Sequence, residues 1–307
     1  MANVHIVVVN YNTADLLRRC LEHAYAGESS HPFTVSVVDN GSADDSLAML
    51  RARFPQARAI ASTRNRGFAG AVNLALRAIE ADLPPVEDRA ARRHEYVLLL
   101  NTDLFLAPES LQVLTDFMER TPNSGVAGPR VEKPDGTLDL ACRRGFPTPA
   151  SSLYKLTGLS RRFPRNARLA GYNLTYLDPG ELAEVDSVMG ACMLVRVAAI
   201  DDAGPMDDSF FMYGEDLDWA WRIKAAGWRV YYVPATRVLH FKGATTARQS
   251  ERMIVEFYRA MYLFYRKHYA PRAPRAFNWL VALGIVARGM LAYGVNALRP
   301  RERKRVA

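Results

Sequence analysis

The stretch VHIVVVNYNTADLLRRCLEHAY (Val4–Tyr25) decides the fold class. Its β-branched beginning, Val4–Val9, predicts a short buried strand. After Asn10–Asn12 the pattern becomes helical, with Thr13 as a plausible N-cap. One face of this helix carries all of its spaced apolar residues, namely Leu16, Leu17, Cys20, Leu21 and Ala24. A strand followed at once by an amphipathic helix is the first half of a βαβ unit.

The same alternation continues to about residue 120. Further strands are expected at Thr34–Val38, Arg58–Ala61 and Tyr96–Leu100. Helices are expected at Ala69–Glu80 and Pro108–Arg120, the latter with Pro108 at its first position. Such alternation predicts an α/β fold with a mostly parallel sheet and helices on both faces.

The middle of the chain is less regular. Ala81–His94 reads as an exposed insertion, and Arg143–Glu184 as a stretch without a clear pattern. After it we expect strands at Val185–Val197 and Trp228–Val233, and between them a helix at Glu215–Ala226 that Gly227 ends.

Composition is that of an ordinary globular protein. Of the 307 residues, 49% are hydrophobic and 23% are charged, which excludes a disordered chain. The length suits one large domain with an appendage or two small domains. Three widely spaced cysteines argue against a disulfide framework or a zinc knuckle and favour a reducing compartment. No secretory signal is visible, so we expect the protein on the cytoplasmic side.

The net charge of +8 is concentrated at the C-terminus. From Pro271 to Ala307 there are eight Arg or Lys and one acid, Glu302, which gives +7 and leaves about +1 for the rest. A nucleic-acid-binding protein would carry such charge on its folded surface. We therefore expect no nucleic-acid partner.

The C-terminal region predicts two helices. The first, Ser250–His268, carries Ile254, Phe257, Tyr258, Met261, Phe264 and Tyr265 along one side. The second, Phe277–Leu298, is apolar, with arginines at both ends and a narrow polar stripe of Asn278, Asn296 and Arg288. Spanning a bilayer would place Arg288 near its centre, at a cost of roughly 2.5–3.5 kcal/mol. An interfacial helix on an anionic membrane is favoured, and a core-packing helix is the alternative.

Polar clusters follow the expected strands. They are Asn10–Asn12, Asp39–Ser42, Thr63–Gly70 and Asn101–Asp103. Each alone could be a turn or a solvated loop. Ligands bind at the carboxyl ends of strands in open α/β sheets, so the four clusters together favour a ligand site. The G-x-G-x-x-G fingerprint of a dinucleotide dehydrogenase is missing after the first strand.

Five motifs in order make the chain recognisable. VVVNYN (Val7–Asn12), VVDNGS (Val37–Ser42), NRGFAGAVN (Asn65–Asn73), LLNTD (Leu99–Asp103) and MYGEDLDWAWR (Met212–Arg222) resemble family 2 glycosyltransferases. The nearest subgroup is the bacterial rhamnosyltransferases of cell-wall and O-antigen assembly, and the resemblance covers roughly residues 4 to 245. It implies a GT-A fold, a nucleoside-diphosphate sugar donor, a divalent cation and inversion at the anomeric carbon.

The resemblance also implies an organisation. Residues 1–248 would form the glycosyltransferase domain, with a nucleotide-sugar-binding half to about residue 125 and an acceptor-binding half after it. Residues 249–307 would add amphipathic helices and the basic tail.

Donor-site residues follow from the same motifs. The residue matching Asp39 hydrogen-bonds the pyrimidine, and those matching Asn10 and Asn12 line its pocket. The full implied set is Val9, Asn10, Tyr11, Asn12, Asp39, Asn65, Arg66, Gly67, Asn73, Asn101, Thr102 and Asp103.

A metal site is implied at Asp103. It matches the last acid of the family's DxD motif, which holds Mg²⁺ or Mn²⁺ against the diphosphate. The chain departs from the motif at Asn101, where an amide replaces the first carboxylate and one negative charge is lost. His240 matches a position where relatives place a metal-binding histidine; the alternative is a structural histidine at a strand end.

The catalytic base is implied at Asp216, in the Gly214-Glu215-Asp216 sequence before a helix. A single carboxylate suffices for one in-line displacement. Acids in a first turn also stabilise the helix dipole, and Asp218 with Arg222 reads as an i,i+4 pair. On the acceptor side we expect Gly190, Tyr213, Glu215 and Trp219, although such aromatic residues also fit a core.

Two other functions are alternatives. A sugar nucleotidyltransferase would need a glycine-rich basic loop after the first strand, which the chain lacks. A noncatalytic membrane-docking module would not need Asp39, Asp103 and Asp216. Subgroup resemblance favours dTDP-L-rhamnose as donor, with UDP-galactofuranose or another UDP-sugar left open. It favours a polyprenyl-diphosphate-linked saccharide as acceptor, at the inner face of the cell membrane; the sequence does not decide the oligomeric state.

Overall fold

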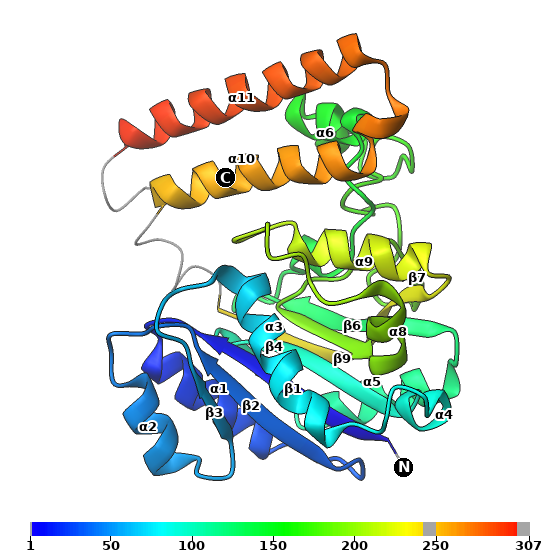
Figure 1. Ribbon diagram of the computed structural model, residues 1–307. Helices are drawn as coiled ribbons and strands as arrows, with labels where there is room; N and C mark the ends of the chain where they lie inside the picture. Colours follow the sequence, from blue (N-terminus) through cyan, green and yellow to red (C-terminus); the bar gives the residue numbers. More distant parts are fainter. Residues whose placement is uncertain (1, 242–249, 300–307) are drawn as a thin grey trace.

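A mixed β-sheet forms the centre of the protein. The computed structural model describes residues 2–241 and 250–299 (Figure 1). Within them the strand order is β3-β2-β1-β4-β8-β6-β9-β5, and β7 pairs with β9. The strands are β1 (Asn3–Asn10), β2 (Phe33–Asp39), β3 (Arg58–Ala61), β4 (Glu95–Asn101), β5 (Leu104–Leu106), β6 (Ser124–Glu132), β7 (Ala183–Val185), β8 (Cys192–Arg196) and β9 (Arg229–His240).

Most of the sheet is parallel, as the alternation of strands and helices predicts. Strands β1 to β4 pair in parallel, as do β6 and β9. Strand β8 lies antiparallel between β4 and β6, and β5 and β7 pair antiparallel with β9. The first half is therefore a regular parallel α/β arrangement, and the antiparallel strands all belong to the side of the sheet beyond β4.

Helices flank this sheet (Figure 1). They are α1 (Ala14–Tyr25), α2 (Ser46–Arg53), α3 (Gly67–Ile79), α4 (Arg89–Arg92), α5 (Ser110–Arg120), α6 (Pro149–Leu156), α7 (Leu159–Arg162), α8 (Val197–Ala203), α9 (Glu215–Ala225), α10 (Ser250–His268) and α11 (Arg275–Ala297).

Helix α1 buries the predicted face but is capped differently. Leu17, Cys20, Leu21 and Ala24 are buried. Thr13 occupies the N-cap position, yet its side chain makes no capping bond. Its hydroxyl instead donates to Asn10 Oδ1 at 2.8 Å, and the Asp44 carboxylate accepts from the Ala14 N–H. The threonine thus ties the first turn of α1 to the strand end.

Three other expectations are corrected. Helix α5 begins at Ser110 rather than at Pro108, with Glu109 as its N-cap. The insertion at 81–94 is not wholly exposed: Arg92 is buried and pairs with Asp201 and Glu80 at 2.8 and 3.1 Å. The stretch at 143–184, expected to be irregular, contains α6 and α7.

The long strand expected at Val185–Val197 is interrupted. Only β7 and β8 form, and residues 186–191 lie between them. Backbone groups in this interval form hydrogen bonds with side chains rather than with a neighbouring strand. The Val188 carbonyl accepts from Arg144, and the Gly190 N–H donates to Asp216. An apolar run on its own cannot reveal such an interruption.

Helix α10 is attached to α9 by apolar and charged contacts. Phe210, Leu217, Ala260 and Phe264 form an apolar cluster between them. Asp218 is fully buried; besides the expected bond to Arg222 at 2.8 Å it pairs with Lys267 and His268, also at 2.8 Å. Burial alone would raise the pKa of Asp218, but its hydrogen bonds to His268, Lys267 and Arg222 lower it to about 2.

Helix α11 lies along α10, at the end of the molecule remote from the sheet (Figure 1). Asn278 accepts from the Tyr265 hydroxyl at 2.6 Å and Asn296 is buried, so both asparagines of the expected stripe face inward, whereas Arg288 is exposed. The outward face carries Trp279, Leu280, Leu283, Met290 and Leu291, each at least 60% exposed. By length and composition α11 could cross a membrane.

Candidate active site

The polar clusters meet at one edge of the sheet. Strand register places Asn10 opposite Asp39, and Val9 opposite Asn101, on neighbouring parallel strands. This is the edge formed by the carboxyl ends of β1, β2 and β4, where open α/β sheets bind ligands.

A hydrogen-bond network organises the ends of β1 and β2. Asn10 Nδ2 donates to Asp39 Oδ1 at 3.0 Å and to Ser42 Oγ at 3.1 Å. Asp39 Oδ2 accepts from the Ser42 N–H, and Ser42 Oγ accepts from the Asn12 N–H. Asn12 has a left-handed backbone with φ of 55°, and its side chain accepts from the Ala43 N–H. Asp39 and Asn10 are therefore buried and already partnered, while Tyr11 and Asn12 are half-buried at the rim.

The loop before α3 is fixed by a second network. Asn40 Nδ2 donates to Asn65 Oδ1, and Asn40 Oδ1 accepts from the Arg66 N–H. Gly67 has φ of 75°, and a Cβ there would lie 2.2 Å from the Phe211 carbonyl oxygen. Only glycine permits this approach. This approach brings the segment that leads to Glu215 and Asp216 against the loop before α3, called here the donor-side loop because the resemblance implies that it binds the donor.

Asp103 and His240 lie together, as the resemblance implies. His240 Nε2 is 3.5 Å from Asp103 Oδ1, and its Nδ1 is 3.1 Å from Asp139 Oδ2. Burial alone would lower the pKa of His240, but the hydrogen bonds with Asp103 and Asp139 outweigh it and raise that pKa. Each ring nitrogen faces a carboxylate, so each needs a proton or a cation between the two groups.

This pair fits a divalent cation that shares its ligands with phosphate. The Nδ1–H of His240 can donate to the Asp139 carboxylate, which leaves Nε2 without a proton and free to bind metal, the usual outer-shell arrangement. Within residues 2–241 and 250–299, no group of three or more His, Cys, Asp or Glu side chains is arranged as a complete metal site. A cation here would depend on phosphate oxygens for the rest of its ligands, as Mg²⁺ commonly does.

Asp216 is held at the N-terminus of α9 by an arginine. Its Oδ2 accepts from Arg144 Nη2 at 2.6 Å and from the Gly190 N–H at 2.9 Å. Burial alone would lower the pKa of Arg144, and the Asp216 carboxylate more than reverses this. A Cβ at Gly190 would come within 2.9 Å of Asp216 Cβ, so the glycine allows this approach. The next residue, Ala191, accepts from the Asn101 N–H, which joins this region to the donor side.

Glu215 lies beside this ion pair but outside it. Its side chain is buried, and Oε2 has no hydrogen-bond partner among the described residues. Burial, and secondly the charge of Asp216, raise the pKa of Glu215 to about 8. At neutral pH Glu215 is therefore mostly protonated, whereas Asp216 forms an ion pair with the guanidinium of Arg144.

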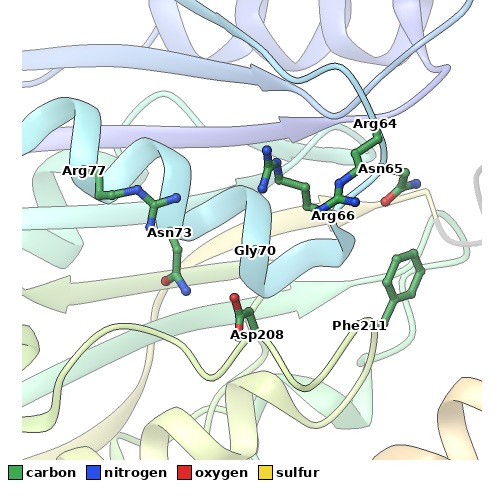
Figure 2. A pocket seen from close by; sticks show the side chains of 8 residues that line it. All are labelled: Arg64, Asn65, Arg66, Gly70, Asn73, Arg77, Asp208 and Phe211. Atoms are coloured by element: carbon green, nitrogen blue, oxygen red, sulfur yellow. The ribbon is translucent and has the colours of Figure 1, made fainter.

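A cavity of about 300 Å³ opens beside the donor-side loop (Figure 2). Arg64, Arg66 and Arg77 are exposed at it and take part in no ion pair within the described ranges. Their guanidinium groups suit an anionic ligand such as phosphate. The lining residues are Arg64, Asn65, Arg66, Gly70, Asn73, Arg77, Asp208 and Phe211.

Three expected site residues have other contacts. Asn73 exchanges two hydrogen bonds with the Met206 backbone, so its amide clamps α3 to that segment although it borders the cavity. Trp219 is fully buried and donates to the Gly204 carbonyl. That places Trp219 in the core rather than at an acceptor surface, because α9 turns this side toward α8. Tyr213 is half-buried and packs edge-on against Phe257 of α10.

Three residues of the site were not expected. Arg144 pairs with Asp216, Asp139 with His240, and Ser42 joins Asn10 to Asn12. Ser42 ends the VVDNGS motif, but Arg144 lies in the stretch without a clear pattern, and Asp139 lies in none of the expected elements or motifs. Only their tertiary partners reveal them.

Family comparison decides the kind of site. The family described as "Glycosyl transferase family 2" matches residues 5–183, more than half of the chain, and "Glycosyl transferase family group 2" matches residues 158–288. The chain belongs to glycosyl transferase family 2. The polar strand ends and the Asp216 region are thus the candidate active site of a glycosyltransferase.

Individual relatives agree with this family. The chain is 29% identical to the Mycobacterium tuberculosis N-acetylglucosaminyl-diphospho-decaprenol L-rhamnosyltransferase, over 97% of this chain and 95% of that one. It is 26% identical to the Escherichia coli rhamnosyltransferase WbbL, over 78% and 83%. The solved S. aureus TarS 1-349 in complex with UDP matches with a TM-score of 0.56 at 16% identity, over 98% and 76%. That structural likeness supports the GT-A fold of this glycosyltransferase.

Proposed function

We propose that this family 2 glycosyltransferase transfers L-rhamnose from dTDP-L-rhamnose, with inversion, to a polyprenyl-diphosphate-linked saccharide in cell-envelope polysaccharide synthesis. The observation that carries the proposal is the similarity to the Mycobacterium tuberculosis rhamnosyltransferase along 97% of the chain. A UDP-sugar, such as UDP-galactofuranose, is the alternative donor.

The donor would occupy the carboxyl edge of β1, β2 and β4. Asp39 would receive a hydrogen bond from the pyrimidine through lone pairs that Asn10 and Ser42 leave open, since each carboxylate oxygen can accept more than one bond. The arginines beside Asn65 and Gly67 would face the anionic part of the donor.

Mg²⁺ or Mn²⁺ would be held by Asp103 Oδ1 and His240 Nε2, which lie 3.5 Å apart. When bound, such a cation supplies positive charge to the departing diphosphate. Asn101, in place of a carboxylate, leaves the protein with fewer negative ligands, so the metal should bind together with the nucleotide rather than before it.

Asp216 would act as general base. The oxygen of the acceptor hydroxyl attacks the anomeric carbon, the bond from that carbon to the diphosphate oxygen breaks, and the hydroxyl proton passes to Asp216. Arg144 and the Gly190 N–H both donate to Oδ2 and so position this carboxylate, while Oδ1 accepts, among the described residues, only from the Leu217 N–H and keeps a lone pair for the acceptor.

The C-terminal helices would rest on the cytoplasmic face of the membrane. Helix α10 is charged along its length, with Arg252, Glu256, Arg259, Arg266 and Lys267, so it cannot enter hydrocarbon. Because α11 packs lengthwise on α10, with Gly289 against Tyr258, an interfacial position for α11 explains its exposed apolar face better than a span.

Donor hydrolysis tests the transferase. With Mn²⁺ present, the protein should slowly release dTDP from dTDP-rhamnose and transfer rhamnose to a polyprenyl-diphosphate-linked N-acetylglucosamine. Faster release of UDP from a UDP-sugar would show that the donor is the UDP-sugar and not dTDP-rhamnose. Release of pyrophosphate from a nucleoside triphosphate would indicate a nucleotidyltransferase. Release of none of the three would leave only a binding module.

Truncation tests the membrane part. Removing residues 269–307 should leave nucleotide binding intact and sharply reduce sedimentation with anionic vesicles, and high salt should weaken binding of the full chain. Undiminished vesicle binding by the truncated chain would exclude α11 as the main anchor.

A further inference from the structure

Residues 149–170, called here the basic unit, project from the catalytic fold through a narrow neck. At the neck the Gly145 N–H donates to the Tyr172 carbonyl at 2.9 Å. A Cβ at Gly145 would lie 2.2 Å from the Gly171 carbonyl oxygen, so the two chain segments that form the neck are in direct backbone contact. Between these points the chain forms α6 and α7 and then turns back.

The charge of the basic unit has one sign. It contains Lys155, Arg161, Arg162, Arg165 and Arg168 and no acidic residue. None of these five takes part in an ion pair with another described residue; Lys155 and Arg162 instead face the rings of Tyr172 and Phe163. Every residue from 161 to 168 is exposed. Surface arginines in a folded domain usually have acidic neighbours, so a charge of +5 without any suits an anionic partner outside the chain.

Large apolar side chains are exposed on the same unit. Leu153 and Leu156 are 54% and 58% exposed, and Leu159 and Phe163 are also exposed. Leu153 and Leu156 stand at i,i+3 on α6 and so share a face. Arg162, Phe163 and Arg165 line a cavity of about 460 Å³ with Pro164 and Asn166. Exposed apolar side chains bordered by unpaired arginines are characteristic of a surface that binds a lipid interface.

We propose that the basic unit is a second membrane-binding element, which inserts Leu153, Leu156 and Phe163 among anionic lipids while Arg162 and Arg165 bind their phosphate groups. An anionic lipid surface complements the positive charge of the basic unit, and the position of α6 in the molecule agrees with this partner. Figure 1 shows α6 at the end of the molecule that carries α11, remote from the sheet. This inference extends the proposed function, because it adds a contact to the same membrane face.

The main test is vesicle sedimentation of the full-length protein. Vesicles contain phosphatidylglycerol and phosphatidylcholine in roughly equal parts, with pure phosphatidylcholine as the comparison. Each arginine near an anionic surface contributes about fivefold to binding, so R162A/R165A should bind on the order of 10- to 30-fold more weakly. The matched control is R51A/R53A, which removes two exposed arginines from α2 and should change binding little.

Fluorescence tests insertion directly. All three cysteines are buried, so a dye would label Leu156→Cys selectively. An environment-sensitive dye at position 156 should shift to the blue when anionic vesicles are added, and one on Arg51→Cys should not. Because residue 156 is already exposed, this substitution should leave the fold intact.

The outcomes separate the two proposals. Equal vesicle binding by wild type and R162A/R165A, without a spectral shift at position 156, would overturn the proposal that the basic unit binds lipid. Helix α11 could then still anchor the protein. Self-association without lipid that R162A/R165A abolishes would assign the surface to a second copy and overturn it too. No vesicle binding by wild type would overturn both membrane contacts, and dTDP release would decide the transferase independently.

Discussion

Asp216→Asn tests whether Asp216 is the general base. The amide keeps the shape of the carboxylate but cannot take a proton, so transfer should fall by about 10²- to 10⁴-fold, the usual effect of a lost general base. Donor affinity should hardly change, because no donor-side residue bonds to Asp216. Single-turnover transfer and calorimetry with dTDP measure the two quantities.

The structure also predicts a stability cost. Arg144 is largely buried and loses its carboxylate partner in Asp216→Asn. Removing one partner of a buried pair costs about 3–5 kcal/mol. We expect the lower end, about 3 kcal/mol, because Glu215 can ionise once the charge of Asp216, which helps to raise its pKa, is gone. Urea unfolding gives this value, and rates must be taken where the variant is folded.

Glu215→Gln is the matched control at the neighbouring position. Since Glu215 is mostly protonated at neutral pH, a neutral amide should keep the rate within about tenfold. An inactive Glu215→Gln with an active Asp216→Asn would move the base to Glu215. Activity in both would refute an inverting mechanism that uses either carboxylate.

Three further predictions concern the same site. The pKa of Glu215 is raised from 4.5 to about 8 by burial and by Asp216, so its contribution to stability is complete below pH 4.5 and is lost as pH rises through 8. The loss is up to about 1.4 kcal/mol per pH unit; urea unfolding should therefore show a flatter pH dependence in Glu215→Gln, and an unchanged one would contradict the assignment. Asp39→Ala should weaken dTDP binding by about 1–3 kcal/mol in calorimetry, whereas Asp45→Ala, at an exposed N-cap without a capping bond, should not; unchanged affinity for both dTDP and UDP would remove Asp39 from the pocket. Asp103→Asn should raise the Mn²⁺ concentration needed for tight donor binding, and an identical Mn²⁺ titration would place the metal elsewhere.

Local patterns in the sequence were enough for most elements of the fold. Helix α10 has the predicted bounds, Ser250–His268, and β3 has the predicted bounds, Arg58–Ala61. Both signals are local: apolar spacing within α10, and for β3 a short segment that precedes the polar cluster at Thr63–Gly70. The polar residues at the strand ends, where we propose that the donor binds, were visible for the same reason.

The pairing of remote residues could not be predicted. Arg144 is 72 positions from Asp216, and Asp139 is 101 positions from His240. Arg144 and Asp139 belong to no motif, so both look like solvated side chains until the fold buries them. The same holds for residues 186–191. There an apolar run predicts one continuous strand, but the backbone forms hydrogen bonds with Arg144 and Asp216 instead.

The neck at Gly145 and Gly171 has a consequence for which acceptors the enzyme can use. It follows directly after Arg144, which holds Asp216, while Asp218, two residues further on, holds α10 and with it α11. Both elements that we propose to contact lipid are thus fixed to a single turn of α9. On a bilayer this fixes the height of Asp216 above the lipid phosphates. A lipid-linked saccharide would then be selected by length, because only a hydroxyl the right number of sugars from its diphosphate reaches that height.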